Sequence, residues 1–260
     1  MLNLPDGKIY NFFIDDNVFF FTDIYKKNCK SIFDHFYLEN LRKIHQKYGT
    51  LFTLNCFRHN HHEPDFDISL FPDKYRSEFE DNANWLRLAF HADNEQPPYP
   101  YGKAYPEKLA EHFLRFKEEI IRIAGERTFI APVIIHCFDV DDCGRKFLRE
   151  NGMKCFAVRQ AEKYTFDPGF DQLEMAVDMF LNLYYSDLEQ MKKDLAQKIA
   201  AGQQKILIGS HEQYAYSHYR KYIPEYFDGV DAVCRMLTEN NYKSVYYSEC
   251  VINTAEEDNI

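Results

Sequence analysis

Side chains that bind metal ions or transfer protons recur just after apolar segments of this sequence. They are two adjacent aspartates, a histidine followed by a glutamate at i+4, and two further histidines: Asp15, Asp16, His91, Glu95, His136 and His211. If the apolar segments are strands of a parallel barrel, their carboxyl ends share one rim, and these side chains converge there. Carboxylate and imidazole ligands together suit Zn²⁺, Mn²⁺, Fe²⁺ or Co²⁺, so the pattern predicts a divalent metal site.

The two aspartates come directly after the apolar segment 9–14. Neighbouring carboxylates at the end of a buried strand disfavour each other's ionisation unless a cation or hydrogen-bond donors compensate. One of them could therefore bind the metal while the other acts as a base. The alternative is a strand-to-loop turn in which both carboxylates cap nearby backbone N–H groups.

The histidines have comparable alternatives. On a helical turn or a tight loop, His91 and Glu95 would both point at one ion; otherwise His91 stacks on an aromatic ring and Glu95 is solvated. His211 is a candidate for the acid that protonates a leaving group, because imidazole titrates near neutrality. His136 is either that acid or a residue that supports the site from outside. An ordinary hydrogen-bonded histidine is the alternative for both.

The elements that must position these residues alternate between strand-like and helix-like segments. Strand composition marks about seven segments, namely 9–14, 50–57, 85–90, 128–137, 154–158, 205–209 and 243–248. Helical periodicity marks the segments 31–48, 106–124, 142–151, 171–183, 188–201 and 224–240. Repeated strand–helix units predict an α/β fold with a mostly parallel sheet, closed into an irregular (β/α) barrel. A doubly wound open sheet is the alternative, although no glycine-rich phosphate loop supports a nucleotide-binding version.

Composition limits the classes of protein to which the chain can belong. Its 260 residues are 45% hydrophobic and carry a net charge of −10, which predicts one folded domain over 1–260 that does not bind nucleic acid. No apolar run reaches the ~18 residues of a membrane helix, so no membrane association is expected. The seven cysteines form no CxxC pair and no basic–apolar leader is visible, which predicts a cytoplasmic, reducing location.

Two segments carry a resemblance to a known family. Segment 13–17 (FIDDN) resembles the first motif of the polysaccharide deacetylases, an apolar strand that ends in two aspartates. Segment 85–92 is similar to the second motif, in which two histidines stand at i and i+4; His91 matches the first, and Glu95 stands where the second would be. Segments 133–136 and 209–214 fall where a divergent, poorly characterised branch has further strand-end histidines. The family's arginine- and proline-containing motif has no clear counterpart.

The resemblance implies a metal-dependent hydrolase that removes an N- or O-acetyl group from a carbohydrate. In that case Asp15 is the catalytic base, and Asp16, His91 and Glu95 bind the metal. One alternative is a catalytically silent relative that only binds carbohydrate. Another is a glycoside hydrolase on the same barrel, with Asp15 or Asp16 as nucleophile and one of three glutamates as acid: Glu95, Glu212 or Glu249.

Overall fold

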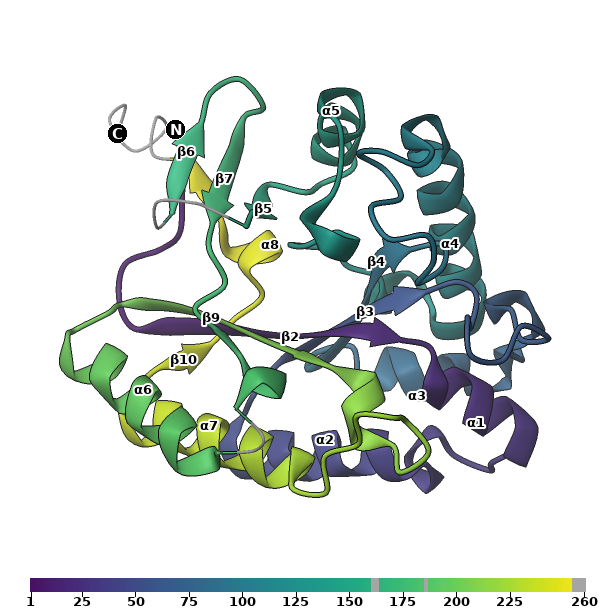
Figure 1. Ribbon diagram of the computed structural model, residues 1–260, viewed down its shortest axis with the longest axis horizontal. Helices are drawn as coiled ribbons and strands as arrows, with labels where there is room; N and C mark the ends of the chain where they lie inside the picture. Colours follow the sequence, from purple (N-terminus) through teal and green to yellow (C-terminus); the bar gives the residue numbers. More distant parts are fainter. Residues whose placement is uncertain (160–163, 185–186, 254–260) are drawn as a thin grey trace.

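The central strand of the largest sheet is β2 (Ile9–Asn17) in the computed structural model, which describes residues 1–159, 164–184 and 187–253. All of its residues are buried, as expected of a strand covered on both faces. The sheet has the order β4-β3-β2-β9-β8, β10 pairs with the start of β2, and all these pairs are parallel (Figure 1). The other strands are β3 (Phe52–Phe57), β4 (Leu86–Ala92), β8 (Met179–Phe180), β9 (Lys205–His211) and β10 (Lys243–Ser244).

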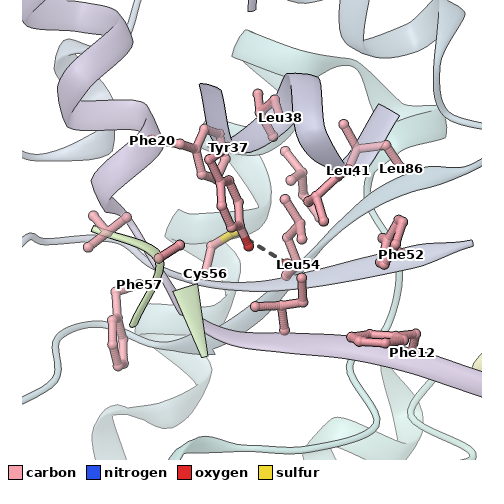
Figure 2. Close-up of a cluster of buried hydrophobic side chains, with 14 of the residues drawn as sticks. Phe12, Phe20, Tyr37, Leu38, Leu41, Phe52, Leu54, Cys56, Phe57 and Leu86 are labelled. Atoms are coloured by element: carbon pink, nitrogen blue, oxygen red, sulfur yellow. Dashed lines mark hydrogen bonds between the residues drawn. The ribbon is translucent and has the colours of Figure 1, made fainter. Parts of the chain in front are cut away.

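Helices pack around this sheet. Figure 1 shows α2, α6 and α7 together along one face, α1 beyond the end of β2, and α4 beside β4, where it also contacts α3. These helices are α1 (Phe19–Lys27), α2 (Phe36–Tyr48), α3 (Arg76–Asp81), α4 (Leu109–Ala124), α6 (Leu188–Ala200) and α7 (Tyr226–Glu239). Figure 2 shows the core between α2 and the sheet, where the large side chains Phe12, Tyr37 and Phe52 lie fully buried. Aromatic residues therefore supply much of the buried apolar surface that stabilises the fold.

Beyond β4 the wall of the barrel becomes irregular. The Ile130 N–H donates to the carbonyl of Leu88 over 3.0 Å, and the Ala157 N–H donates to the carbonyl of Val133 over 2.7 Å. The segment 129–135 thus connects β4 to a second, smaller sheet of order β5-β7-β6. Its strands are β5 (Cys155–Ala157), β6 (Thr165–Asp167) and β7 (Gln172–Met175), and α5 (Asp142–Glu150) precedes them. The predicted α/β fold with an irregular, mostly parallel barrel is confirmed.

Five of the predicted strands are present as β2, β3, β4, β5 and β9, but the strand predicted at 128–137 is wrong. Only Phe129 forms a bridge there, with Leu88. The segment has the apolar composition of a strand, but Pro132 lies in its middle and has no N–H group to donate to a ladder. This explains why no regular strand forms. The strand predicted at 243–248 is two residues long and gives way to α8 (Tyr247–Cys250).

The helix predicted at 171–183 is also wrong, because this segment forms β7, β8 and a short 3₁₀ turn. Its apolar residues Leu173, Met175 and Met179 stand at odd positions, the period of two that a strand requires. Helix α1 was not predicted, since its first turn is an unbroken run of phenylalanines without helical periodicity. Short strands β1 (Leu2–Asn3) and β11 (Ile252–Asn253) pair antiparallel and join the two ends of the described chain. Among the described residues, every helix is too short or too polar to cross a membrane.

Candidate metal centre

The end of β2 brings two adjacent carboxylates to the same place. Neighbouring residues of a regular strand point to opposite faces, yet both aspartates contact one histidine. Asp15 Oδ1 lies 3.7 Å from His91 Nδ1, and Asp16 Oδ1 lies 3.3 Å from His91 Nε2. The pairing of β2 with β3 shifts register between Ile14 and Asn17, and Asp16 has a φ of 60°. This bulge in the left-handed conformation turns the second carboxylate toward the first.

Three side chains form a group that can hold a cation. Asp16, His91 and His136 each offer a ligand atom, and these atoms all lie within 4.8 Å of one another. His136 Nδ1 is 3.2 Å from His91 Nε2 and 3.6 Å from Asp16 Oδ1. His91 is the penultimate residue of strand β4, whereas His136 comes from a 3₁₀ turn at the end of the irregular segment. The group therefore joins the regular and irregular parts of the barrel wall.

The charges in this group need a further partner. Asp16 Oδ1 is buried and has no well-aligned hydrogen-bond donor among the described residues. Burial opposes ionisation of Asp16, but attraction from the three neighbouring histidines holds the pKa of its carboxyl below the usual range. Burial and the nearby His91 lower the pKa of His136 to about 4, so this imidazole is neutral at pH 7 and available as a ligand. A buried carboxylate with two imidazoles fits Zn²⁺, Mn²⁺, Fe²⁺ or Co²⁺.

Asp15 lies beside the group and has its own hydrogen-bond donor. Asn55 Nδ2, from β3, donates to Asp15 Oδ1 over 2.8 Å. Burial nevertheless raises the pKa of Asp15, despite the opposing effect of the histidines and of Asn55. A raised pKa brings a carboxylate closer to the range in which it can accept a proton from water and later release it. Asn55 was not predicted as a site residue, although a lone asparagine inside a buried strand was a visible signal.

A cavity of about 280 Å³ opens over these residues, and His211 lines it. His211 Nε2 is 4.0 Å from Asp16 Oδ2, and its Nδ1 is 2.9 Å from Asn182 Oδ1. The contact with the side-chain carbonyl of Asn182 requires a proton on Nδ1. Nε2 is then the ring nitrogen that faces the site. The walls of the cavity combine apolar and polar groups, which are Ile134, Cys137, Phe138, Arg159, Phe180 and Leu183.

The structure places the Glu95 carboxylate outside the metal group, in contrast to the expectation from the i, i+4 spacing. Its Oε2 accepts hydrogen bonds from His62 Nε2 at 2.9 Å and from Gln213 Nε2 at 3.1 Å. Only its backbone carbonyl faces the site, 3.2 Å from His136 Nε2. The chain after β4 runs into a loop rather than a helical turn, so His91 and Glu95 do not point to one ion. His136 takes the position in the group that was assigned to Glu95.

The glutamates of the glycoside hydrolase alternative are also accounted for. Glu212 is fully buried and accepts from the N–H groups of Val18, Phe19 and Phe20, at the start of α1. Glu249 pairs with Arg87 at 3.2 Å. Neither these two nor Glu95 lines the cavity beside Asp15. The pair of facing carboxylates that glycoside hydrolysis needs is therefore not found among the described residues that line this cavity.

Comparison with known proteins identifies the fold. No protein-family model and no curated protein sequence matches the chain. A peptidoglycan N-acetylglucosamine deacetylase matches 93% of this chain and 87% of its own, with a TM-score of 0.55 and 11% identity. A CE4 family pseudoenzyme from Bacillus anthracis matches 95% of this chain and 66% of its own (TM-score 0.52, 10% identity), and a family 4 carbohydrate esterase from Streptomyces lividans matches 95% and 97% (TM-score 0.51, 8% identity). The chain therefore has the fold of the CE4 polysaccharide deacetylases, with a buried Asp-His-His group at the candidate site.

Proposed function

We propose that the chain is a metal-dependent hydrolase that removes an N- or O-acetyl group from a carbohydrate. The observation that carries this proposal is the buried group of Asp16, His91 and His136 with Asp15 beside it, on a fold shared with carbohydrate deacetylases. A divalent ion bound by those three residues would polarise the acyl carbonyl and stabilise the negative charge that develops on its oxygen.

The remaining steps belong to side chains around the group. Water adds to the acyl carbon while Asp15 takes its proton, with Asn55 holding the carboxylate in place. The bond from the acyl carbon to the sugar nitrogen or oxygen then breaks, the sugar atom takes a proton from His211, and acetate leaves. Asn182 orients His211 by accepting from Nδ1, which leaves Nε2 for this transfer. Exchange with solvent restores both residues.

The decisive experiment combines metal analysis with acetate release. Protein purified without chelator is expected to contain one divalent ion per chain and to release acetate from acetylated oligosaccharides. Asp15→Asn should keep the metal and lose turnover by about 10²- to 10⁴-fold, the usual contribution of a general base. Asp16→Asn should lose the metal itself. If the wild-type protein binds no divalent ion, the proposal fails.

One comparison favours a second candidate, a catalytically silent carbohydrate-binding protein. The Bacillus anthracis protein with this fold is a CE4 family pseudoenzyme. In the silent case, acetylated oligosaccharides bind to the cavity over Asp15 and the metal is retained, but no acetate is released from any of them. Calorimetry with the same oligosaccharides separates this outcome from a complete absence of binding.

A further inference from the structure

The cavity over the candidate metal centre has a cation at its rim. Arg159 lines the cavity and is exposed, while Asp15 and the histidines form the deeper part. One guanidinium nitrogen of Arg159, Nη2, donates to the carbonyl of Cys137 over 3.3 Å, and Cys137 directly follows His136. The arginine is thus fixed to the same turn that supplies a histidine to the metal group.

Arg159 has no carboxylate partner among the described residues, unlike most arginines of the chain. Arg58, Arg87 and Arg145 each form an ion pair with an aspartate or glutamate. Asp139, which lies two residues after Cys137, accepts the backbone N–H of Gly102 instead. A guanidinium carries five N–H donors, and both hydrogen bonds observed for Arg159, to the Cys137 carbonyl and to the Tyr99 hydroxyl at 3.4 Å, come from Nη2.

A second cation lies beside the tyrosine ring that Arg159 contacts. Lys103 Nζ is 4.7 Å from the centre of the Tyr99 ring, and Arg159 Cζ is 5.5 Å from the same ring. Lys103 is exposed and also has no acidic partner within ion-pair distance among the described residues. Two cations thus lie near one tyrosine ring in a chain whose net charge is −10, and one of them, Arg159, lines the cavity. We name Tyr99, Lys103 and Arg159 the cationic rim.

We propose that the cationic rim binds an anionic group of the saccharide, so that the substrate is an acetylated acidic sugar. The proposal rests on the proposed function, because it names the substrate class for the same cavity. A planar guanidinium matches a carboxylate or a phosphate with two parallel N–H···O bonds, which makes Arg159 the specific contact and Lys103 a supporting charge. The apolar walls at Phe138 and Phe180 would receive the uncharged face of the sugar ring.

The test compares acidic and neutral saccharides with the metal-loaded protein. The acidic probes are acetylated oligosaccharides that contain a uronic acid and acetylated oligosaccharides that contain a sugar phosphate; the neutral probe is an N-acetylglucosamine oligosaccharide of equal length. We expect kcat/KM to be at least about tenfold higher for one of the acidic probes, and the preferred probe tells whether the anion is a carboxylate or a phosphate. Arg159→Gln should lower kcat/KM on that probe about 10- to 100-fold, mainly through KM, and change the neutral probe less than about twofold.

Two further variants make the result specific. Arg159→Lys keeps the charge without the planar fork and should recover only part of the lost affinity. Arg235→Gln removes an equal charge from an exposed position on α7 and should leave all probes unchanged. A wild-type protein that treats acidic and neutral probes alike, or an Arg159→Gln variant that keeps the wild-type preference for the acidic probe, overturns the proposal.

Calorimetric binding of the acidic probes separates this proposal from the proposed function. If no probe releases acetate but acidic probes bind in a manner that depends on Arg159, the cationic rim stands and the hydrolase fails. If all probes release acetate and Arg159→Gln changes nothing, the hydrolase stands and the cationic rim fails. An absence of both binding and turnover overturns both.

Discussion

Asn55 donates a hydrogen bond to Asp15 from the neighbouring strand, with 2.8 Å between Nδ2 and Oδ1, and both side chains are buried. The other side-chain atom of Asn55, Oδ1, is buried without a hydrogen-bond partner among the described residues. A buried amide that leaves one atom unsatisfied costs stability. We therefore infer that the role of Asn55 is its side-chain hydrogen bond to Asp15, the proposed base.

We predict that Asn55→Ala reduces turnover while metal binding is retained. Hydrogen bonds to charged groups contribute about 1.5–3 kcal/mol, so kcat should fall about 10- to 100-fold as Asp15 loses its orientation and its carboxylate becomes harder to ionise. Acetate release and metal content are the measurements. Asn40→Ala, which removes a partly exposed asparagine of α2 that, among the described residues, bonds only its own helix, is the control and should have no effect. Unchanged turnover in Asn55→Ala would show that Asn55 does not support the base.

A second prediction concerns which residues bind the metal. Substituting His136 by alanine should weaken metal affinity by more than about 100-fold, since losing even an outer partner of a ligand costs about 10- to 100-fold. Glu95→Gln should retain affinity within about tenfold, because it changes the contacts to His62 and Gln213 but keeps the backbone carbonyl that faces His136. Titration with Zn²⁺ or Mn²⁺ measures both. The reverse result would return Glu95 to the role that its spacing suggested.

A third prediction concerns the pH dependence of stability. Burial raises the pKa of Glu212 to about 7, although Tyr216 and the backbone N–H groups of α1 oppose the rise. Because the folded-state pKa lies above the unfolded value of about 4.3, the folded chain holds this proton more tightly. The stabilisation is complete below about pH 4.3 and is lost as the pH rises through about 7.

Urea unfolding at pH 5 and pH 8 measures this effect. Glu212→Gln imitates the protonated side chain, so the free energy of unfolding of the wild type relative to this variant should fall by about 1–3 kcal/mol between the two pH values. Glu189→Gln removes a carboxylate that is 83% exposed and should show no such difference. A difference that rises with pH would mean that Glu212 is ionised in the folded state at pH 5.

A fourth prediction concerns the cysteines. All seven are free in the structure, and Cys56, Cys155 and Cys234 are buried. Under denaturing, non-reducing conditions we expect seven titratable thiols; in the native protein the exposed Cys143 should react first and the three buried thiols last. We therefore propose that the protein works in a reducing compartment such as the cytoplasm. Intact disulfides in the purified protein would contradict this proposal.

The sequence predicted the fold well where the periodicity of apolar residues and the amino-acid composition indicate the same secondary structure. Strand β2 was visible as an apolar run that ends in two aspartates, and the shared rim of parallel strands explains why His91 and His211 lie near Asp16. The prediction did not find the irregular backbone of the segment that brings His136 into the site. The segment 128–137 has strand composition, but Pro132 interrupts the ladder, and only the folded chain shows that His136 then enters the site from a turn.

The choice of ligands could not be made from spacing. The i, i+4 separation of His91 and Glu95 brings both to one ion only if the chain turns helically after β4, and it does not. The pairs Asn55–Asp15 and Asn182–His211 join residues about 30 to 40 positions apart, and they depend on strand neighbours that the sequence does not specify. Long-range pairs of this kind need the folded structure.

The bulge at the end of β2 has a consequence for protein design. The same two aspartates grafted onto a regular strand would project on opposite sides, and one of them would point away from any shared ligand. At the end of β2, the left-handed backbone at Asp16 removes that conflict. Transplanting this centre into another scaffold would therefore require copying a backbone conformation together with the side chains, and a motif search that scores residue identity alone would accept hosts that cannot assemble it.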